Sequence, residues 1–301
     1  MLAARFAYML ALLAVGGAAR SAGVLAAERR DRLNALAYYV ALPALVFHST
    51  HHRPLGEVFT PALIVGLWAV LLAMVGLSLV VHRDASSGAT WSVATIQSYH
   101  CNLGYLGLPM VAATFGGLAA ARGSLLLGVG ALTQIPLTIF LLVTPNDAAV
   151  EVRAELRTFI GNPIVLSLPV GLAVAGFGVP VPGSVTAATG LVSELALPVA
   201  LVCVGASLDT RRASIRSEGT PSVAALKLLV MPALAWVAFA GMGADQATLR
   251  AGVLMLGMPT AVSTFVYATE HGDDERLAPV NVLPTTVLSA GTLYVLVRLL
   301  A

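Results

Sequence analysis

The stretch CNLGYLGLPM at residues 101–110 departs from the pattern of the chain around it. It lies within a long apolar run, yet it brings together Asn102, Gly104, Gly107 and Pro109. Glycine adds backbone freedom and proline removes a backbone donor, so both weaken a helix that spans a membrane. In lipid, open backbone is tolerated only where it is buried in protein or lines a watery cavity. The stretch therefore predicts an interrupted helix beside a cavity.

The composition is that of a protein embedded in a membrane. Of 301 residues, 58% are hydrophobic and 11% are charged, whereas a soluble domain carries about 25% charged residues. The net charge of +2 offers no basic surface for nucleic acid. The two cysteines, Cys101 and Cys203, lie in apolar stretches and form no disulfide or metal-binding pattern. We expect a multi-pass protein of the cell membrane with no metal, no cofactor and no nucleic-acid partner.

Apolar runs of about 20 residues, the length that crosses a bilayer, recur along the whole chain. Runs bounded by charged or Gly/Pro-rich breaks give ten predicted spans. They cover residues 6–25, 33–47, 61–81, 91–115, 124–143, 159–179, 185–208, 222–240, 249–269 and 278–300. The first run also has the pattern of a signal peptide, which is the alternative interpretation of this segment.

The basic residues predict the orientation of these spans. Of the 17 Lys and Arg residues, ten fall in one set of alternate loops and five in the other. The remaining two, Arg20 and Lys227, fall within predicted spans. Loops rich in Lys and Arg face the cytoplasm, so the count places both termini outside it.

The two halves of the chain carry matching motifs in the same order. GLPMVAATF at 107–115 matches GMPTAVSTF at 257–265, with Gly, Pro, Thr and Phe at identical spacing. Two weaker matches, ALPALV with ALPVAL and Pro136 with Pro284, are also separated by about half the chain. Because each half has an odd number of spans, the second half must enter the membrane from the opposite side. The prediction is an all-α protein of ten transmembrane helices in two inverted five-helix repeats, as in many secondary transporters.

The boundary between the repeats is expected in the longest hydrophilic loop. The first repeat covers residues 1–146, a cytoplasmic connecting loop covers 147–157, and the second, inverted repeat covers 158–301.

The fourth and ninth predicted spans are both interrupted about half-way along. In an inverted repeat the two interruptions would cross at mid-membrane, where half-helix N-termini offer free N–H groups and a partial positive charge to an anion. Asn102 could donate to a carboxylate there, facing hydroxyl groups of the ninth span. The predicted substrate site comprises Asn102, Gly104, Tyr105, Gly107, Pro109, Pro259, Thr260 and Ser263, with Tyr105 as a gate or cavity wall. The alternative is a kinked helix whose polar residues only cap its own backbone.

Several stretches resemble the auxin efflux carrier family, which includes plant PIN-type carriers and bacterial malate or malonate permeases. They are NLGYLGLPM at 102–110, GNPIVLSLPVGL at 161–172, LALPVALVCVGASL at 195–208 and GMPTAVSTFVYATEHGDD at 257–274. The resemblance covers essentially the whole chain.

The resemblance implies a fold and a site. Helices 1, 2, 6 and 7 would form a scaffold, helices 3–5 and 8–10 a moving transport part, and two copies a homodimer. Asn102, Gly107 and Pro109 match the first crossover motif, and Pro259 matches the second. The second motif lacks an amide here, which limits any transfer of two-sided substrate coordination.

Ion coupling depends on a few polar residues inside the predicted spans. His100 directly precedes the first interruption and Glu194 is the acidic residue well inside a span, so both are candidates for carrying a proton. We expect Lys227 to extend towards the membrane interface, with attraction of anions as the alternative.

The function predicted from these features is a secondary carrier that moves small organic acid anions by alternating access. The substrate would be an auxin-like monocarboxylate or a malate- or malonate-like dicarboxylate, and the partners are this anion and the lipid bilayer. The alternative is a sodium-coupled symporter resembling the bile-acid symporters, which would need acidic and amide residues at both crossings. An intramembrane enzyme would need a nucleophile–base pair or paired carboxylates at depth, and neither is evident, so we predict no enzyme.

Overall fold

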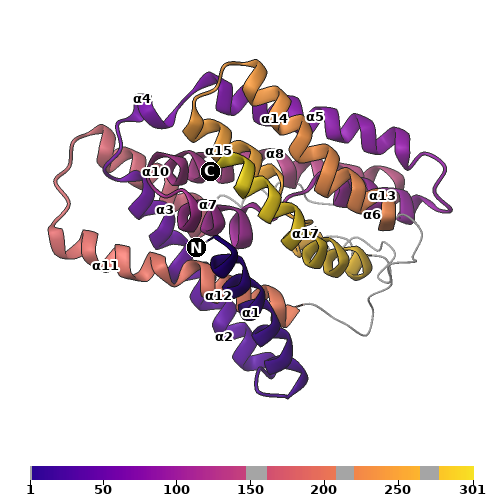
Figure 1. Cartoon of the computed structure of the whole chain (residues 1–301), viewed down its shortest axis with the longest axis horizontal. Coiled ribbons are helices and arrows are strands. Elements are labelled where there is room, and N and C mark those ends of the chain that lie inside the picture. The colour runs from indigo at the N-terminus through magenta and orange to yellow at the C-terminus, as the bar shows by residue number, and fades with distance from the viewer. Residues whose placement is uncertain (1, 147–160, 208–219, 265–277) are drawn as a thin grey trace.

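The protein is a bundle of helices, most of which run in roughly one direction through the molecule (Figure 1). The computed structural model describes residues 2–146, 161–207, 220–264 and 278–301. Within these residues all regular structure is helical, apart from one isolated β-bridge.

The first half begins with a long helix and continues with a second that contains a π-helical turn. Its elements are α1 (Leu2–Ser21), α2 (Ala27–Leu36), η1 (Ala37–Ala41), α3 (Leu42–Thr50), α4 (Leu55–Val58), α5 (Pro61–Val81), α6 (Gly88–Tyr99), η2 (Leu103–Gly107), α7 (Leu108–Thr114) and α8 (Gly117–Asn146). The helix α2–η1–α3 is longer than the predicted span at 33–47 because it continues through the polar segment on either side.

The second half also consists of long helices, and several of them contain a break or a π-helical turn. Its elements are α10 (Pro163–Gly176), α11 (Gly183–Glu194), α12 (Ala196–Ser207), α13 (Thr220–Ala225), η3 (Leu226–Val230), α14 (Met231–Gly241), α15 (Gln246–Leu256) and α17 (Ala278–Leu300). Part of the predicted ninth span, residues 265–269, lies outside the described residues. The inverted relation of the two halves stays a prediction.

Local sequence signals explain where several helices begin. The Thr60 hydroxyl accepts from Leu63 N–H at 3.3 Å, and Pro61 takes the first position of α5. The Asn162 side-chain oxygen accepts from Ile164 N–H at 2.9 Å at the start of α10. Such residues supply partners for N–H groups that the helix itself leaves free.

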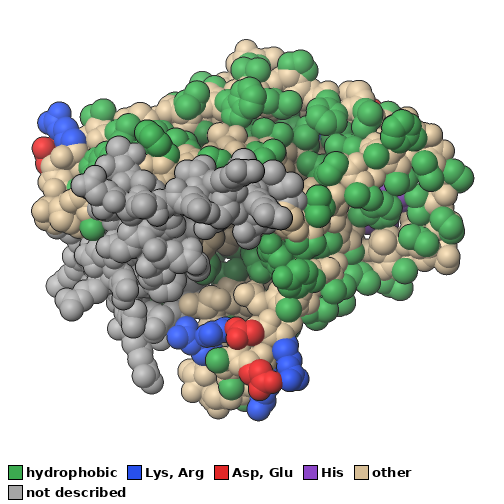
Figure 2. Space-filling model, turned by 180° about the vertical axis from the view of Figure 1, so that it is seen from behind, with side chains coloured by type: hydrophobic (Ala, Val, Ile, Leu, Met, Phe, Trp, Pro, Cys, Tyr) green, Lys and Arg blue, Asp and Glu red, His purple; other side chains and the backbone are tan. Residues whose placement is uncertain are grey.

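The helices have the length and composition of membrane spans. Five are long and apolar enough to cross a bilayer, namely Leu55–Val81, Gly117–Leu142, Gly183–Ser207, Thr220–Gly241 and Asn281–Leu300. Shorter apolar helices cover Ala7–Ser21, Leu103–Thr114 and Pro163–Gly176. Apolar side chains cover much of the surface in Figure 2. Large hydrophobic residues that are exposed include Trp68, Leu72, Leu191 and Val237. The protein is therefore a multi-pass membrane protein.

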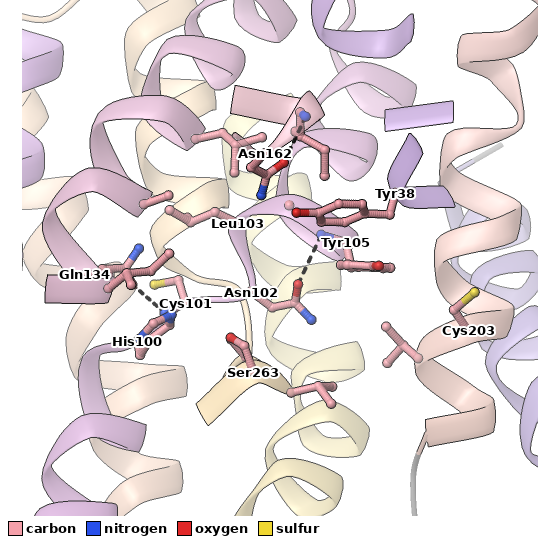
Figure 3. A pocket seen from close by; sticks show the side chains of 18 of the residues that line it. Tyr38, His100, Cys101, Asn102, Leu103, Tyr105, Gln134, Asn162, Cys203 and Ser263 are labelled. Carbon is pink, nitrogen blue, oxygen red and sulfur yellow. Dashed lines mark hydrogen bonds between the residues drawn. The ribbon is translucent and has the colours of Figure 1, made fainter. Parts of the chain in front are cut away.

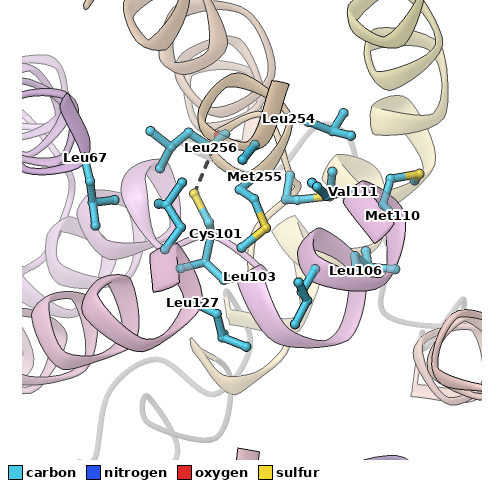
Figure 4. Packing of buried hydrophobic residues seen from close by; sticks show 14 of the residues in the cluster. Leu67, Cys101, Leu103, Leu106, Met110, Val111, Leu127, Leu254, Met255 and Leu256 are labelled. Atoms are coloured by element: carbon cyan, nitrogen blue, oxygen red, sulfur yellow. Dashed lines mark hydrogen bonds between the residues drawn. The ribbon is translucent and has the colours of Figure 1, made fainter. Parts of the chain in front are cut away.

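The helices pack as two neighbouring groups. In one group α1 lies along α12, and α3 packs against α10 and α11. In the other, α14 packs against α5 and α15, while α8 packs against α6, α7 and α15. Apolar side chains from α15, including Leu254 and Met255, gather with Leu106, Met110 and Val111 around the turn that joins η2 to α7 (Figure 4).

The contact between α1 and α12 depends on glycine. A Cβ atom at Gly16 would run into the carbonyl of Val202, and one at Gly205 would run into the carbonyl of Leu13. Small residues of this kind let two helix backbones approach each other closely inside a membrane. The first predicted span is thus an integral part of the packed bundle.

Candidate functional site

Two interrupted helices meet at one place in the structure. The helix α6 ends at Tyr99 and resumes as η2 at Leu103, while α15 ends at Leu256. After each of these helix ends the backbone is extended, and Cys101 of the first stretch forms an isolated antiparallel bridge with Thr260 of the second. Asn102 N–H donates to the Pro259 carbonyl at 3.0 Å, and Ala261 N–H donates to the His100 carbonyl at 3.2 Å. Each interruption thus satisfies backbone groups that the other leaves open.

Side chains from α8 hold the first interruption in position. The Gln134 side-chain oxygen accepts from Cys101 N–H at 2.6 Å. The Thr138 hydroxyl lies 2.8 Å from His100 Nδ1 and 2.9 Å from the Tyr99 hydroxyl. These contacts leave the chain from Tyr99 to Cys101 with little freedom.

A second set of hydrogen bonds holds the interruption that follows α15. Thr260 is fully buried and its hydroxyl donates to the Gln97 carbonyl at 2.8 Å. The Gln97 side-chain oxygen accepts from Asn281 Nδ2 at 2.7 Å, which links α6 to α17. The hydroxyl of Thr260 therefore supports the site from behind.

Asn102 is the amide at the first interruption, and it lines a cavity. Its side-chain oxygen accepts from Tyr105 N–H at 3.2 Å, which caps η2 and fixes the orientation of the amide. Within the described part of the chain, Asn102 Nδ2 has no hydrogen-bond partner, and Figure 3 shows it directed away from Tyr105 into the cavity. A side-chain donor is thus available to a bound molecule.

The cavity beside Asn102 has a volume of about 390 Å³. It lies between the interrupted helices and the group of helices that contains α2, α10 and α12. Its polar lining consists of Asn34, Tyr38, His100, Asn102, Tyr105, Gln134, Asn162, Ser207 and Ser263, together with the thiols of Cys101 and Cys203. The described lining contains no Asp, Glu, Lys or Arg, and it combines polar groups with apolar side chains such as Leu103, Leu127 and Ile135.

The structure divides the predicted site residues into two sets. His100, Asn102, Gly104, Tyr105 and Ser263 line the cavity. Gly107, Pro109, Pro259, Thr260 and Glu194 do not line it.

Gly107 and Pro109 pack in the core, and a Cβ atom at Gly107 would lie 3.0 Å from Met255 Sδ. Pro259 is buried and contributes its carbonyl to Asn102 N–H. Glu194 is exposed at the end of α11 and does not line the cavity. The structure thus brings together the amide, the glycine, the tyrosine and the serine, and places the prolines behind them.

Several cavity residues escaped the sequence analysis. Tyr38 lies in the π-helical turn η1, and Asn162 caps α10. Tyr38 and Asn162 face Tyr105 and Asn102 across the cavity in Figure 3. The pair Asn162–Pro163 predicts the start of a helix, but it does not predict which residues lie opposite that start in the folded protein.

Lys227 differs from its sequence-based expectation. We expected its side chain to extend to the membrane interface, but it is 0% exposed. Its ammonium group contacts Cys101 Sγ, behind the wall of the cavity. The expectation was wrong because Lys227, which lies in the π-helical turn η3, packs into the bundle against Cys101 and Met231.

At one end of the bundle, a polar network around Arg122 joins three segments. Arg122, at the start of α8, donates to Asp245, to the Thr248 hydroxyl at 2.8 Å and to the Glu57 carbonyl at 2.9 Å. Burial alone would raise the pKa of Asp245, but hydrogen bonds from Thr248 and Arg122 outweigh it and hold the pKa below its usual value. The network ties α4, α8 and the start of α15 at one end of the bundle.

A multi-pass helical bundle with a polar cavity at two interrupted helices is an architecture typical of membrane transporters. The chain belongs to the family described as "Membrane transport protein", whose model matches residues 6–297. This family contains the auxin efflux carriers, so the resemblance seen in the sequence is confirmed. The protein is therefore a membrane transporter rather than an enzyme.

Two relatives cover nearly the whole chain. One, from Rhizobium meliloti (strain 1021), bears the name "Putative malonate transporter"; it is 26% identical over 91% of this chain and 88% of its own length. The other, from Methanothermobacter thermautotrophicus, is named "Uncharacterized transporter"; it is 25% identical over 93% of this chain and 92% of its own length.

Proposed function

We propose that the protein is a secondary carrier of small organic acid anions, with dicarboxylates of the size of malonate as the first class to test. It works by alternating access and has ten spans in two inverted repeats, with both termini outside the cytoplasm. Helices α1, α2–α3, α10 and α11–α12 form the scaffold, through which two copies associate. The remaining helices carry the substrate site across the membrane.

The observation that carries this proposal is the free Nδ2 of Asn102. A carboxylate needs donors, and in a cavity whose described walls carry no Asp, Glu, Lys or Arg an amide held by its own oxygen is a pre-oriented donor. The Ser263 hydroxyl lies on the neighbouring interruption and offers a second donor. A carboxylate would therefore bind on the side of Asn102, with the rest of the molecule towards Tyr38 and Tyr105.

The size of the cavity suits this class of substrate. Its volume of about 390 Å³ lies within the range of roughly 300–1,000 Å³ that is usual for small-molecule sites. The volume admits both a short dicarboxylate and a larger aromatic monocarboxylate. The name of the Rhizobium relative is the reason to begin with malonate.

The position of the cavity supports the proposal that it opens towards the cytoplasm. Asn34, Asn162 and Ser207 line it from helix ends next to the loops expected in the cytoplasm. The α2 helix beside its mouth carries Arg29, Arg30 and Arg32, and charged side chains gather at this projecting end of the molecule in Figure 2. On the proposed orientation, the described conformation would exchange substrate with the cytoplasm.

The test is uptake into proteoliposomes of labelled malonate, malate and indole-3-acetate, with imposed pH, sodium and voltage gradients. Asn102→Asp keeps the side-chain oxygen that caps η2, but replaces the Nδ2 donor by a negative oxygen, so it should abolish uptake while the protein stays folded. Asn102→Ala removes both the donor and the cap. If Asn102→Asp transports an accepted acid as well as the wild type does, the site is not here. If uptake requires sodium, the alternative of a sodium-coupled symporter replaces the proposal.

A further inference from the structure

Lys227 is a buried cation placed behind both interruptions at once. It lies in η3 and its side chain is 0% exposed. Its Nζ donates to Cys101 Sγ at 2.7 Å, in the first interruption, and to the Leu256 carbonyl at 3.4 Å, at the end of α15. A third contact, at 3.0 Å, is to Met231 Sδ on the next turn of its own helix. π-helical turns of this kind occur frequently at functional sites.

The charge of this lysine has little local compensation. Among the residues that the structure describes, no carboxylate lies within 4.0 Å of Nζ. A thiol, a thioether and one carbonyl solvate an ammonium group poorly compared with water. The Leu256 carbonyl belongs to the C-terminal end of α15, whose partial negative charge offsets only part of the cost. A buried charge without a counter-charge is expensive, and in membrane spans such residues are mostly functional.

The missing counter-charge has a natural place in the cavity. Cys101, which touches Lys227, also lines the cavity between His100 and Asn102. Lys227 itself does not line it. One side chain therefore separates the ammonium group from a chamber whose described walls carry no charged residue. Across this short, water-poor distance a positive charge acts strongly on an anion.

A charge placed behind the wall has a different effect from one that touches the substrate. A direct ion pair would hold a carboxylate tightly, and release would be slow. A cation set back by one side chain lowers the energy of any anion in the cavity without forming a bond that must break on exit. It also disfavours cations and gives no advantage to a neutral molecule of the same shape.

We propose that Lys227 is the charge-selectivity residue of the transporter: it makes the neutral cavity specific for anions through Cys101, without touching the substrate. This inference rests on the proposed function of the cavity as an organic-anion site. Asn102 orients the carboxylate, and Lys227 provides the preference for its charge.

The test compares ligands of equal size and different charge. Affinities of the purified protein for malonate, monomethyl malonate and malonamide give the preference for two, one and no negative charges. In Lys227→Met and Lys227→Gln we expect the affinity for malonate to fall by about tenfold to a hundredfold, while the affinity for malonamide stays unchanged. Gln keeps a hydrogen-bond donor towards Cys101 and Leu256, so an equal loss in both variants separates charge from positioning.

The control is Arg122→Met, which removes another buried cation, one that pairs with Asp245 and does not line the cavity. It should leave the preference for charge intact. Melting temperatures identify variants that have lost their fold, and Lys227→Met should melt no lower than the wild type because it removes an uncompensated charge.

The inference is overturned if both variants keep the wild-type preference for malonate over malonamide. It is also overturned if Gln restores malonate binding, or if the affinities for all three ligands fall together. If the wild type binds no carboxylate at all, the proposed function fails, and the role of Lys227 falls with it.

Discussion

Replacing Gly205 by alanine tests the contact that holds the first helix in the bundle. The added Cβ would meet the backbone of α1 at Leu13, and a backbone cannot move aside as a flexible side chain can. Overpacking of this kind costs about 1–3 kcal/mol, and the rigid obstacle favours the upper end. At roughly 2–4 °C per kcal/mol, we expect the melting temperature in detergent to fall by about 5–10 °C.

Gly17 provides the matched control for this substitution. A Cβ there would lie 3.6 Å from the Gly205 carbonyl, an ordinary contact. Gly17→Ala should therefore leave the melting temperature unchanged or raise it slightly, because alanine favours a helix over glycine by about 0.5–1 kcal/mol. Equal melting temperatures for Gly205→Ala and the wild type would refute the close α1–α12 contact. They would also revive the interpretation of the first apolar run as a removable signal peptide.

Three further predictions concern the site and its supports. Thr260→Val should reduce uptake severalfold without changing substrate preference. The substitution removes the bond to the Gln97 carbonyl, and losing the donor to this buried acceptor costs about 1–3 kcal/mol. A changed preference would place Thr260 in the cavity instead. Tyr38→Ala should widen the cavity and shift the kcat/KM ratio towards bulkier acids, and an unchanged ratio for indole-3-acetate over malonate would contradict this. Because the pKa of Asp245 is lowered in the folded protein, its bonds stabilise the fold above about pH 4, and this stabilisation is lost as the pH falls further. The difference in melting temperature between the wild type and Asp245→Asn should therefore disappear at low pH. A difference that stays constant with pH would contradict this prediction.

The interruptions themselves could be predicted from the sequence. Asn102, Gly104 and Gly107 form a local signal, since the physics of open backbone in lipid leaves few ways to accommodate them. The match between 107–115 and 257–265 adds the partner, and the structure joins Thr260 of the second segment to Cys101, which precedes the first.

The opposite wall of the cavity could not be predicted in the same way. Tyr38 and Asn162 are adjacent to Asn102 only because α2–η1–α3 and α10 pack against the interrupted helices with a particular rotation. That rotation depends on close contacts between helices, and an apolar surface gives little periodic signal because lipid-facing and protein-facing residues are both apolar.

Single polar residues were also difficult to assign. Thr260 and Ser263 look alike in the sequence, but one bonds the Gln97 carbonyl from a buried position and the other lines the cavity. Lys227 lies near the predicted end of a span, which favoured an extended side chain, but the structure buries it within the π-helical turn η3. Side-chain direction in an irregular turn depends on the local backbone, which hydropathy does not record.

The bridge between the two interruptions also has a consequence for biosynthesis. Asn102 N–H and the His100 carbonyl find their partners on residues 259 and 261, which the ribosome adds more than 150 residues later. Until then the helices that precede residue 147 lack the partners of these two backbone groups, and an unpaired backbone group is costly in lipid. The first half of the chain therefore cannot complete its own fold. A truncated chain ending before α15 should be degraded, and co-expression of the missing second half should rescue it.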